Sequence, residues 1–290
     1  MTYQIVTDSC CDLPYTFLKE KNVPFISMTV IVDGQEYFDD LGENFKPAWL
    51  YEQLAAGKMP TTSQISPGRY LDFFRPYAEK NIPLLYLCFS SGLSGSYQSA
   101  LQAVELLKEE YPDADVTVFD TKNACLGEGL VVYYAALMQE AQKPLAEIID
   151  WVTKNAIAVH SFVKVEDLEH LKRSGRISKT AAVLGNLMNI KPLLVMDSLG
   201  KLQNVAKARG NQKAMDRLVE DTVATIQHPE NQTLFIAHAD DLASATGLKE
   251  QLMARLPIKD VLIYPMGATI SSHTGLGCIA LFSIGTPRTL

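Results

Sequence analysis

Segments typical of strands and helices alternate along the first 160 residues of this 290-residue chain. Such alternation lets each helix return the chain to the same edge of a sheet, so it favours a parallel sheet covered on both faces. We therefore expect residues 1–160 to form an N-terminal α/β domain. Its strands are predicted over 4–7, 23–32, 82–89, 115–119 and 157–163. Its helices are predicted over 13–21, 47–56, 67–79, 97–110, 128–142 and 145–155.

The second part of the chain has a different order of elements. The turn Asp197-Ser198-Leu199-Gly200 joins two apolar runs as a hairpin, which is typical of an α+β domain with a mixed, partly antiparallel sheet. We expect this C-terminal domain to span residues 161–290. Its strands are predicted over 190–196, 201–206, 232–238, 259–264 and 278–284. Its helices are predicted over 166–173, 178–188, 210–226 and 241–255.

The composition argues against several functional classes. A net charge of −7 argues against general binding to nucleic acid or to anionic membranes. No apolar run reaches the roughly 18 residues of a membrane span, and Met1-Thr2-Tyr3-Gln4 lacks the basic start of a secretory signal. The five cysteines match no zinc spacing and no C-x-x-C pair. We therefore expect free thiols and a cytoplasmic location, with a redox-active Cys10-Cys11 pair as the alternative.

The run Ser90-Ser91-Gly92-Leu93-Ser94-Gly95-Ser96 is the clearest indication of a ligand site. It joins the predicted strand 82–89 to the predicted helix 97–110. Small hydroxyl and glycine residues at such a turn leave backbone N–H groups open and direct a helix N-terminus at the ligand. The turn therefore predicts a site for an anion, which is a phosphate, a carboxylate or an oxyanion.

Two further segments are candidates for additional hydrogen-bond donors. Thr61-Thr62-Ser63-Gln64 precedes a predicted helix, so its simple interpretation is an N-cap and its functional one is a second bank of neutral donors. His273 lies in a glycine-rich stretch that we interpret as a loop between two apolar strands. The small residues beside it would let a ligand or another backbone approach closely.

Charged residues give no strong indication of a metal site. The other histidines share no ligand spacing. Four aspartates are expected to be caps and turn residues, with a magnesium site as the alternative: Asp8, Asp12, Asp39 and Asp40. Four cations fall within eight residues and form either a solvated helix end or a docking patch for an acidic partner or a membrane surface. They are Lys172, Arg173, Arg176 and Lys179.

The same residues allow more than one function. Ser94, then Asp197 or Asp240, then His273 follow the chain order of an α/β-hydrolase, which makes a serine hydrolase of acyl esters the rival hypothesis. That motif requires Gly-x-Ser-x-Gly, however, and Ser96 stands in place of the last glycine. Hydroxyl and imidazole groups also suit a buried carboxylate, which is costly unless it is hydrogen-bonded. A small phosphorylated metabolite is a third possibility.

Several motifs together resemble the DegV family of bacterial fatty-acid-binding proteins, over residues 4 to about 284. The resemblance implies two α/β domains with a long-chain fatty acid between them. It implies a carrier for lipid transport or fatty acid metabolism that performs no chemistry and uses no cofactor. The motifs are Thr7-Asp8-Ser9 with Asp12-Leu13-Pro14, Thr62-Ser63-Gln64, the Ser90–Tyr97 run, Gly175-Arg176-Ile177-Ser178, Ile190-Lys191-Pro192 and His273-Thr274-Gly275.

The resemblance also implies roles for single residues and partners. The residues implied for the carboxylate are Thr62, Ser63, Ser94, Gly95, His273 and, near that network, Arg209. Arg173 and Arg176 would belong to a surface for docking or for transient membrane contact. In some members the partner is a dihydroxyacetone-kinase-like fatty acid kinase, which makes an acyl phosphate. Neither a nucleic acid nor a metal is implied.

Overall fold

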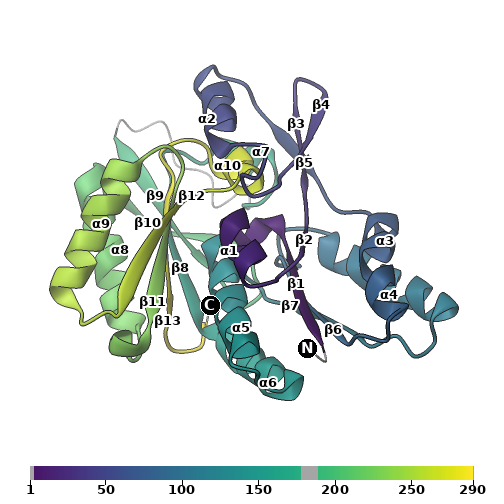
Figure 1. Cartoon of the computed structure of the whole chain (residues 1–290). Coiled ribbons are helices and arrows are strands. Elements are labelled where there is room, and N and C mark those ends of the chain that lie inside the picture. Colours follow the sequence, from purple (N-terminus) through teal and green to yellow (C-terminus); the bar gives the residue numbers. More distant parts are fainter. Residues whose placement is uncertain (1–2, 178–188, 290) are drawn as a thin grey trace.

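The computed structural model describes residues 3–177 and 189–289, and its strands form three sheets, A, B and C (Figure 1). Sheet A is parallel, with the strand order β2-β1-β6-β7. Its strands are β1 (Gln4–Asp8), β2 (Phe25–Ile26), β6 (Leu84–Cys88) and β7 (Val116–Asp120). The parallel sheet predicted for the N-terminal part is therefore confirmed.

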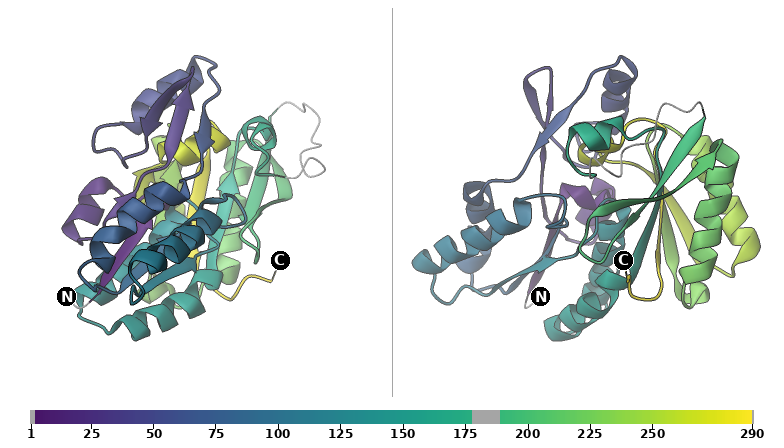
Figure 2. Two further views of the ribbon diagram at one scale, coloured as in Figure 1. Left: turned by 90° about the vertical axis from the view of Figure 1, so that its right-hand side faces the viewer. Right: turned by 180° about the vertical axis from the view of Figure 1, so that it is seen from behind.

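Helices cover both faces of sheet A, with α3 and α4 on one side and α5 on the other (Figures 1 and 2). The helices of this part are α1 (Tyr15–Glu20), α2 (Pro47–Ala55), α3 (Pro67–Ala78), α4 (Ser96–Glu110), α5 (Leu126–Glu140) and α6 (Leu145–Asn155). Short 3₁₀ turns η1 (Ser9–Cys11) and η2 (Ala156–Ala158) follow β1 and α6.

Sheet B is a small antiparallel sheet that the sequence analysis did not predict. Its strands, in the order β4-β3-β5, are β3 (Thr29–Val32), β4 (Gln35–Phe38) and β5 (Thr61–Ser63). The single strand expected over 23–32 is wrong, because the chain leaves sheet A after β2 and enters sheet B at β3. The backbone N–H of Met28 donates to Ser9 Oγ at 2.9 Å at this crossing point.

Sheet C is mixed, with the order β10-β9-β8-β13-β11-β12, in which only β11 and β12 pair in parallel. The mixed sheet expected in the C-terminal part is thus confirmed. Its strands are β8 (Val159–Lys164), β9 (Ile190–Met196), β10 (Leu202–Arg209), β11 (Thr233–His238), β12 (Asp260–Pro265) and β13 (Ile279–Ile284). The helices of this part are α7 (Glu169–Arg173), α8 (Asn211–Thr225), α9 (Leu242–Arg255) and α10 (Ala268–Thr274), with a 3₁₀ turn η3 (Pro229–Asn231).

The predicted boundary at residue 160 falls within β8, which already belongs to sheet C. The helix predicted over 178–188 lies outside the described residues.

Helix α5 joins the two parts, because it contacts sheet A on one side and strands β8, β11 and β13 of sheet C on the other (Figure 1). All seven residues from Leu126 to Val132 are buried. A helix that is apolar on most sides is typical of a position between two layers. One continuous core therefore extends from sheet A to sheet C, and a second core lies where α8 and α9 cover the other face of sheet C.

Two glycines in helices give a matched test of this packing. A Cβ added at Gly129 in α5 would lie 2.3 Å from the carbonyl oxygen of Cys11, whereas one at Gly247 in α9 would meet nothing within 4 Å. We expect Gly129→Ala to lower the free energy of unfolding by about 2 kcal/mol because it overpacks the core. Gly247→Ala should raise it by about 0.5–1 kcal/mol through helix propensity. Urea unfolding measures both free energies. If both substitutions stabilise the protein, α5 is not packed closely at Gly129.

Candidate ligand-binding site

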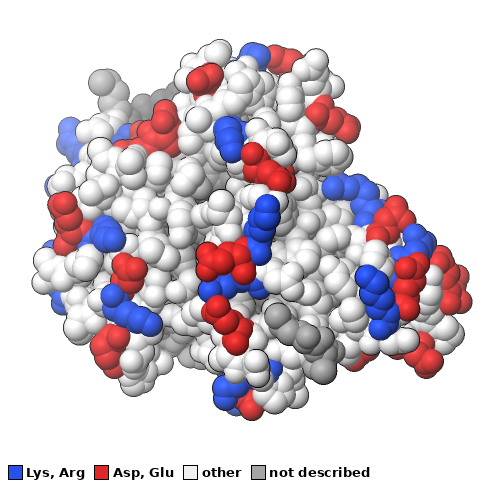
Figure 3. All heavy atoms as spheres, viewed as in Figure 1, with Lys and Arg blue, Asp and Glu red and all other residues white. Residues whose placement is uncertain are grey.

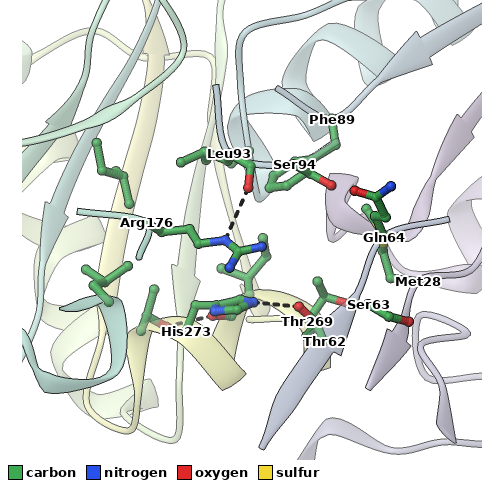
Figure 4. Close-up of a pocket in the computed structure, with 15 residues that line it drawn as sticks. Met28, Thr62, Ser63, Gln64, Phe89, Leu93, Ser94, Arg176, Thr269 and His273 are labelled. Carbon is green, nitrogen blue, oxygen red and sulfur yellow. Dashed lines mark hydrogen bonds between the residues drawn. The ribbon is translucent and has the colours of Figure 1, made fainter. Parts of the chain in front are cut away.

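One cavity of about 540 Å³, including its open mouth, lies between the two parts of the chain (Figure 4). The lining comes from both parts: Met28, Thr62, Ser63, Gln64, Phe89, Leu93, Ser94, Ala124, Leu171, Arg176, Leu202, Thr269, Ile270, His273 and Thr274. No aspartate or glutamate is in this set. The cavity is therefore apolar over most of its wall, and its polar lining consists of hydroxyl groups and the side chains of Gln64, Arg176 and His273.

Strand β5 and helix α10 bring Thr62 and His273 together. Thr62 is half-buried between two exposed neighbours on β5, as expected for alternating side chains on a strand at the surface. Its Oγ1 lies 2.7 Å from His273 Nε2, the one hydrogen bond in Figure 4 that joins the two parts of the chain through side chains alone. His273 Nδ1 is buried and has no hydrogen-bond partner among the described residues.

Two of our local predictions were wrong here. Thr62 and Ser63 are strand residues rather than part of an N-cap, and His273 stands in the last turn of α10 rather than in a loop. Polar, partly exposed residues on a three-residue strand have no alternation that sequence can detect. Apart from Ile270 and His273, the residues of α10 are small or hydroxyl-bearing. Most of the helix is buried, so it lacks the amphipathic pattern that marks longer helices.

Buried hydrogen bonds hold α10 against the segment that carries β5. The Asp39 carboxylate accepts hydrogen bonds from the N–H of Thr269 at 2.8 Å and from its Oγ1 at 2.7 Å. Tyr51 of α2 donates to the carbonyl of Met266, just before α10. Burial raises the pKa of Asp39, and the two bonds from Thr269 oppose that rise. Because these contacts join the two sides of the cavity, they set how closely Thr62 approaches His273.

The turn after β6 places Ser94 at the N-terminus of α4. Its Oγ lies 2.9 Å from Ser96 Oγ and accepts a hydrogen bond from the Ser96 N–H at 3.2 Å. Gly95 is the N-cap of α4, and a Cβ added there would lie 2.1 Å from Gln64 Oε1. A side chain at position 95 would therefore have to displace the flexible end of Gln64. Gly95 does not itself line the cavity, but its neighbour Ser94 does.

The acidic side chain of Asp8 holds the start of this turn. Its carboxylate accepts hydrogen bonds from the Phe89 N–H at 2.9 Å, from the Tyr86 hydroxyl at 2.7 Å and from the Cys10 N–H at 3.0 Å. Asp8 is fully buried, and burial raises the pKa of its carboxyl against these hydrogen bonds. Its role in the structure is that of a cap, as the sequence analysis expected.

Arg176 lies in the cavity, whereas the sequence analysis assigned it to a docking surface. Its Nε donates to the carbonyl of Leu93 at 3.2 Å, and its guanidinium points into the hollow beside His273 (Figure 4). Arg173 is exposed, and its guanidinium donates to the carbonyls of Met59 and Pro60 at 3.2 and 3.1 Å. A docking role for either arginine stays a prediction.

Arg209, like Gly95, was predicted beside the carboxylate but does not line the cavity. It is exposed at the end of β10, paired with Ile190 on the edge of sheet C. Exposed and half-buried residues alternate along this strand, and Lys207 and Arg209 share its exposed face. Thr62, Ser63, Ser94 and His273 do line the cavity, and their role in binding stays a prediction.

The serine hydrolase arrangement does not occur. Ser94 Oγ has Ser96 as its partner, and the His273 imidazole has Thr62, so no hydroxyl–imidazole pair forms between Ser94 and His273. Asp197 instead accepts hydrogen bonds from Leu199, Lys201 and Gln203 and thereby organises the turn between β9 and β10.

Other candidate sites give no cluster. Across residues 3–177 and 189–289, no group of three or more His, Cys, Asp or Glu side chains is arranged to hold a metal ion. All five cysteines are free and buried. Among the helices that the structure describes, none has the length and apolar character that a membrane span requires. Charges of both signs are interspersed over the face in Figure 3.

Comparison with known proteins gives a consistent result. A family model, DegV, described as an uncharacterised protein of the DegV family, matches residues 2–286. A DegV domain-containing protein of Clostridium perfringens is 43% identical over 286 residues, which are 99% of this chain and 98% of the relative.

Solved structures that resemble this chain include members of the same family. A DegV family protein from Thermus thermophilus, described by its fatty acid binding, is 30% identical with a TM-score of 0.87, over 98% of this chain and 100% of that one. A protein from Thermotoga maritima, described as revealing a fatty acid binding function, is 27% identical with a TM-score of 0.83, over 98% and 99%. From the match along almost its whole length, this chain belongs to the DegV family.

Proposed function

We propose that this chain binds one long-chain fatty acid without a covalent bond, in the cavity between the domains 1–160 and 161–290. The observation that carries the proposal is a cavity with a largely apolar wall that is also lined by Thr62, Ser94, Arg176 and His273. The relatives described as fatty-acid-binding proteins support the same ligand class. We assign the carboxylate to these groups, with Ser63 and the Gly95 backbone beside them.

The donors suit a carboxylate that is to remain unchanged. Hydroxyl groups and an imidazole can donate hydrogen bonds to both oxygens, and the guanidinium of Arg176 supplies a positive charge. Burial, followed by the charges of Arg176, Arg173 and His170, lowers the pKa of His273 from 6.5 to about 4. His273 is therefore a neutral donor at neutral pH, and among the described residues of the lining Arg176 is the only cationic side chain.

The tail and the head have different energetic roles. Burying about 14 methylenes contributes roughly 11 kcal/mol before losses, at about 0.8 kcal/mol per methylene. Ordering and translational losses remove much of this. A single hydrogen bond to the head contributes only about 1–3 kcal/mol. The tail should therefore set affinity and the head groups should set orientation, as expected of a carrier rather than an enzyme.

We further propose that the carrier works in the cytoplasm and presents the carboxyl group to a fatty acid kinase of the dihydroxyacetone-kinase type. The exposed Lys172 and Arg173 stand close in sequence to Arg176 at the cavity and would form the docking surface. The same cations would favour transient contact with an anionic membrane.

Denaturing extraction and mass spectrometry test the proposed function. The purified wild-type chain should yield about one fatty acid per protein, and Ser94→Ala and His273→Ala should each retain about half of that or more, because the tail dominates affinity. In both variants the ¹³C-labelled carboxyl group of the bound fatty acid should no longer be held in one defined position.

Two results would overturn this proposal. One is total loss of lipid in both variants with the fold intact. The other is a covalent adduct of Ser94 with an active-site fluorophosphonate, which would favour the hydrolase.

The role of Arg176 in binding the head group can be tested independently of docking. We expect Arg176→Gln to weaken binding of palmitate about tenfold, since a hydrogen bond to a charged group is lost. Binding of methyl palmitate, which has no charge, should change little. Displacement of a fluorescent fatty acid measures both affinities, and Arg217→Gln on the exposed face of α8 is the matched control. An equal loss for the acid and the ester would refute a charge-specific role.

The neutrality of His273 predicts a dependence of stability on pH. Its folded pKa of about 4 lies below the ordinary 6.5, so the unfolded chain binds more protons in this window and stability falls as the pH drops from 6.5 toward 4. We expect His273→Asn to remove about 2 kcal/mol of the loss in unfolding free energy between pH 7.5 and pH 5. Urea unfolding at both pH values, with the exposed His228→Asn as control, measures this difference. An unchanged slope in His273→Asn would contradict it.

A further inference from the structure

A buried arginine in the C-terminal tail lies outside the cavity and yet is tied to its wall. Arg288 follows β13 and is only 7% exposed. Its Nη1 donates to Asn123 Oδ1 and to the Val159 carbonyl, both at 2.7 Å, and its Nη2 donates to the Lys122 carbonyl at 3.0 Å. The planar guanidinium thus joins the tail, the start of β8 and the loop between β7 and α5 through one rigid group.

The loop that Arg288 holds is in an unusual conformation. Lys122 has φ +52°, a left-handed value that a residue with a side chain adopts only when its surroundings enforce it. The Lys122 N–H donates to Asp120 Oδ1 at 3.0 Å, and its carbonyl accepts from Arg288. The Asn123 amide donates to the Ala156 carbonyl at 2.8 Å. The next residue, Ala124, lines the cavity.

From this loop the hydrogen bonds continue to Ser90, which is fully buried. The Ser90 N–H donates to the Asn123 carbonyl at 3.0 Å. Its own carbonyl accepts from the N–H groups of Leu93 and Ser94, at 3.1 and 3.2 Å. The Asn123 carbonyl therefore supports the turn that holds Ser94 at the cavity.

Ser90 also fastens this turn to the C-terminal part. Its Oγ donates to the Gly200 carbonyl at 2.7 Å and accepts from the Gly92 N–H at 3.1 Å. A Cβ added at Gly92 would lie 2.5 Å from the Gly200 carbonyl oxygen, and one added at Gly200 would lie 3.0 Å from Lys122 Cα. The three backbone segments are therefore in direct contact, so a shift of the Lys122 loop displaces the other two.

We propose that Arg288 is a positioning residue for the fatty-acid head group, acting through Asn123 and Ser90 on the turn that carries Ser94. This inference rests on the proposed function. Lysine would keep the charge but cannot donate in three fixed directions from one plane, so the geometry of the guanidinium is what matters. Removing it leaves the Asn123 oxygen and the carbonyls of Val159 and Lys122 without this partner.

The experiment uses the full chain loaded with palmitic acid labelled with ¹³C at the carboxyl carbon. The variants are Arg288→Gln, Arg288→Lys, Ser94→Ala and the double variant Arg288→Gln/Ser94→Ala, with Arg255→Gln at the exposed end of α9 as control. The carboxyl resonance reports the head group, the rate of palmitate transfer to albumin reports its hold, and the melting temperature reports the fold.

If the proposal is correct, Arg288→Gln moves the carboxyl resonance toward its position in Ser94→Ala and speeds palmitate transfer about fivefold. Arg288→Lys moves the resonance in the same direction, and the double variant shifts it less than the sum of the single changes, because both act on one turn. The control leaves the resonance unchanged.

An unmoved resonance in Arg288→Gln and Arg288→Lys, with a lowered melting temperature, would overturn the inference and leave Arg288 with a purely structural role. If Arg288→Gln does not fold, the milder Arg288→Lys decides by the same criterion. A wild-type chain that takes up no palmitate would instead refute the proposed function itself.

Discussion

Helix α5 is buried on nearly every side because sheet A and sheet C both pack against it. Each sheet needs a cover for an apolar face, and sharing one helix removes both faces from water at once. Gly129 permits this arrangement by letting the helix approach the Cys11 carbonyl. Because Ala124 lies two residues before α5 and lines the cavity, the packing of this helix also fixes part of the cavity wall.

Buried polar groups then set the finer geometry of the site. Asp8 and Asp39 each accept backbone and side-chain hydrogen bonds from another segment, Asp8 at the start of the Ser94 turn and Asp39 at the start of α10. A buried carboxyl is costly by itself, but several hydrogen bonds offset much of that cost and specify one arrangement. The neutral cavity groups are thus held by acidic residues that never touch the cavity.

Much of the fold could be predicted because long elements have strong patterns. The structure has β9 at 190–196 and α6 at 145–155, the residues that the apolar runs indicated. Strand β5 and helix α10 could not be predicted, since three polar residues and a seven-residue helix of mostly small residues carry no periodicity. Both elements are held by tertiary contacts, namely pairing with β3 and the Asp39–Thr269 bonds.

The site was predicted only in part, because the sequence does not show which side chains the fold brings to the cavity. Motifs identified Thr62, Ser94 and His273, which do meet at one cavity, but not the position of Arg176 in it or that of Arg209 outside it. In the sequence, a cluster of Lys and Arg residues looks the same whether its side chains face water or a cavity. Apolar lining residues such as Phe89 and Ile270 are likewise indistinguishable from core in the sequence.

The pairing of Thr62 with His273 joins residues 211 positions apart, on opposite sides of the cavity. Neither half of the chain holds a complete binding surface. Any molecule that fills the space must therefore draw its binding free energy from both halves, and that energy adds to whatever keeps them docked. Occupancy and the cooperativity of unfolding are consequently linked quantities in this protein: a loaded chain resists separation of its halves more than an empty one does.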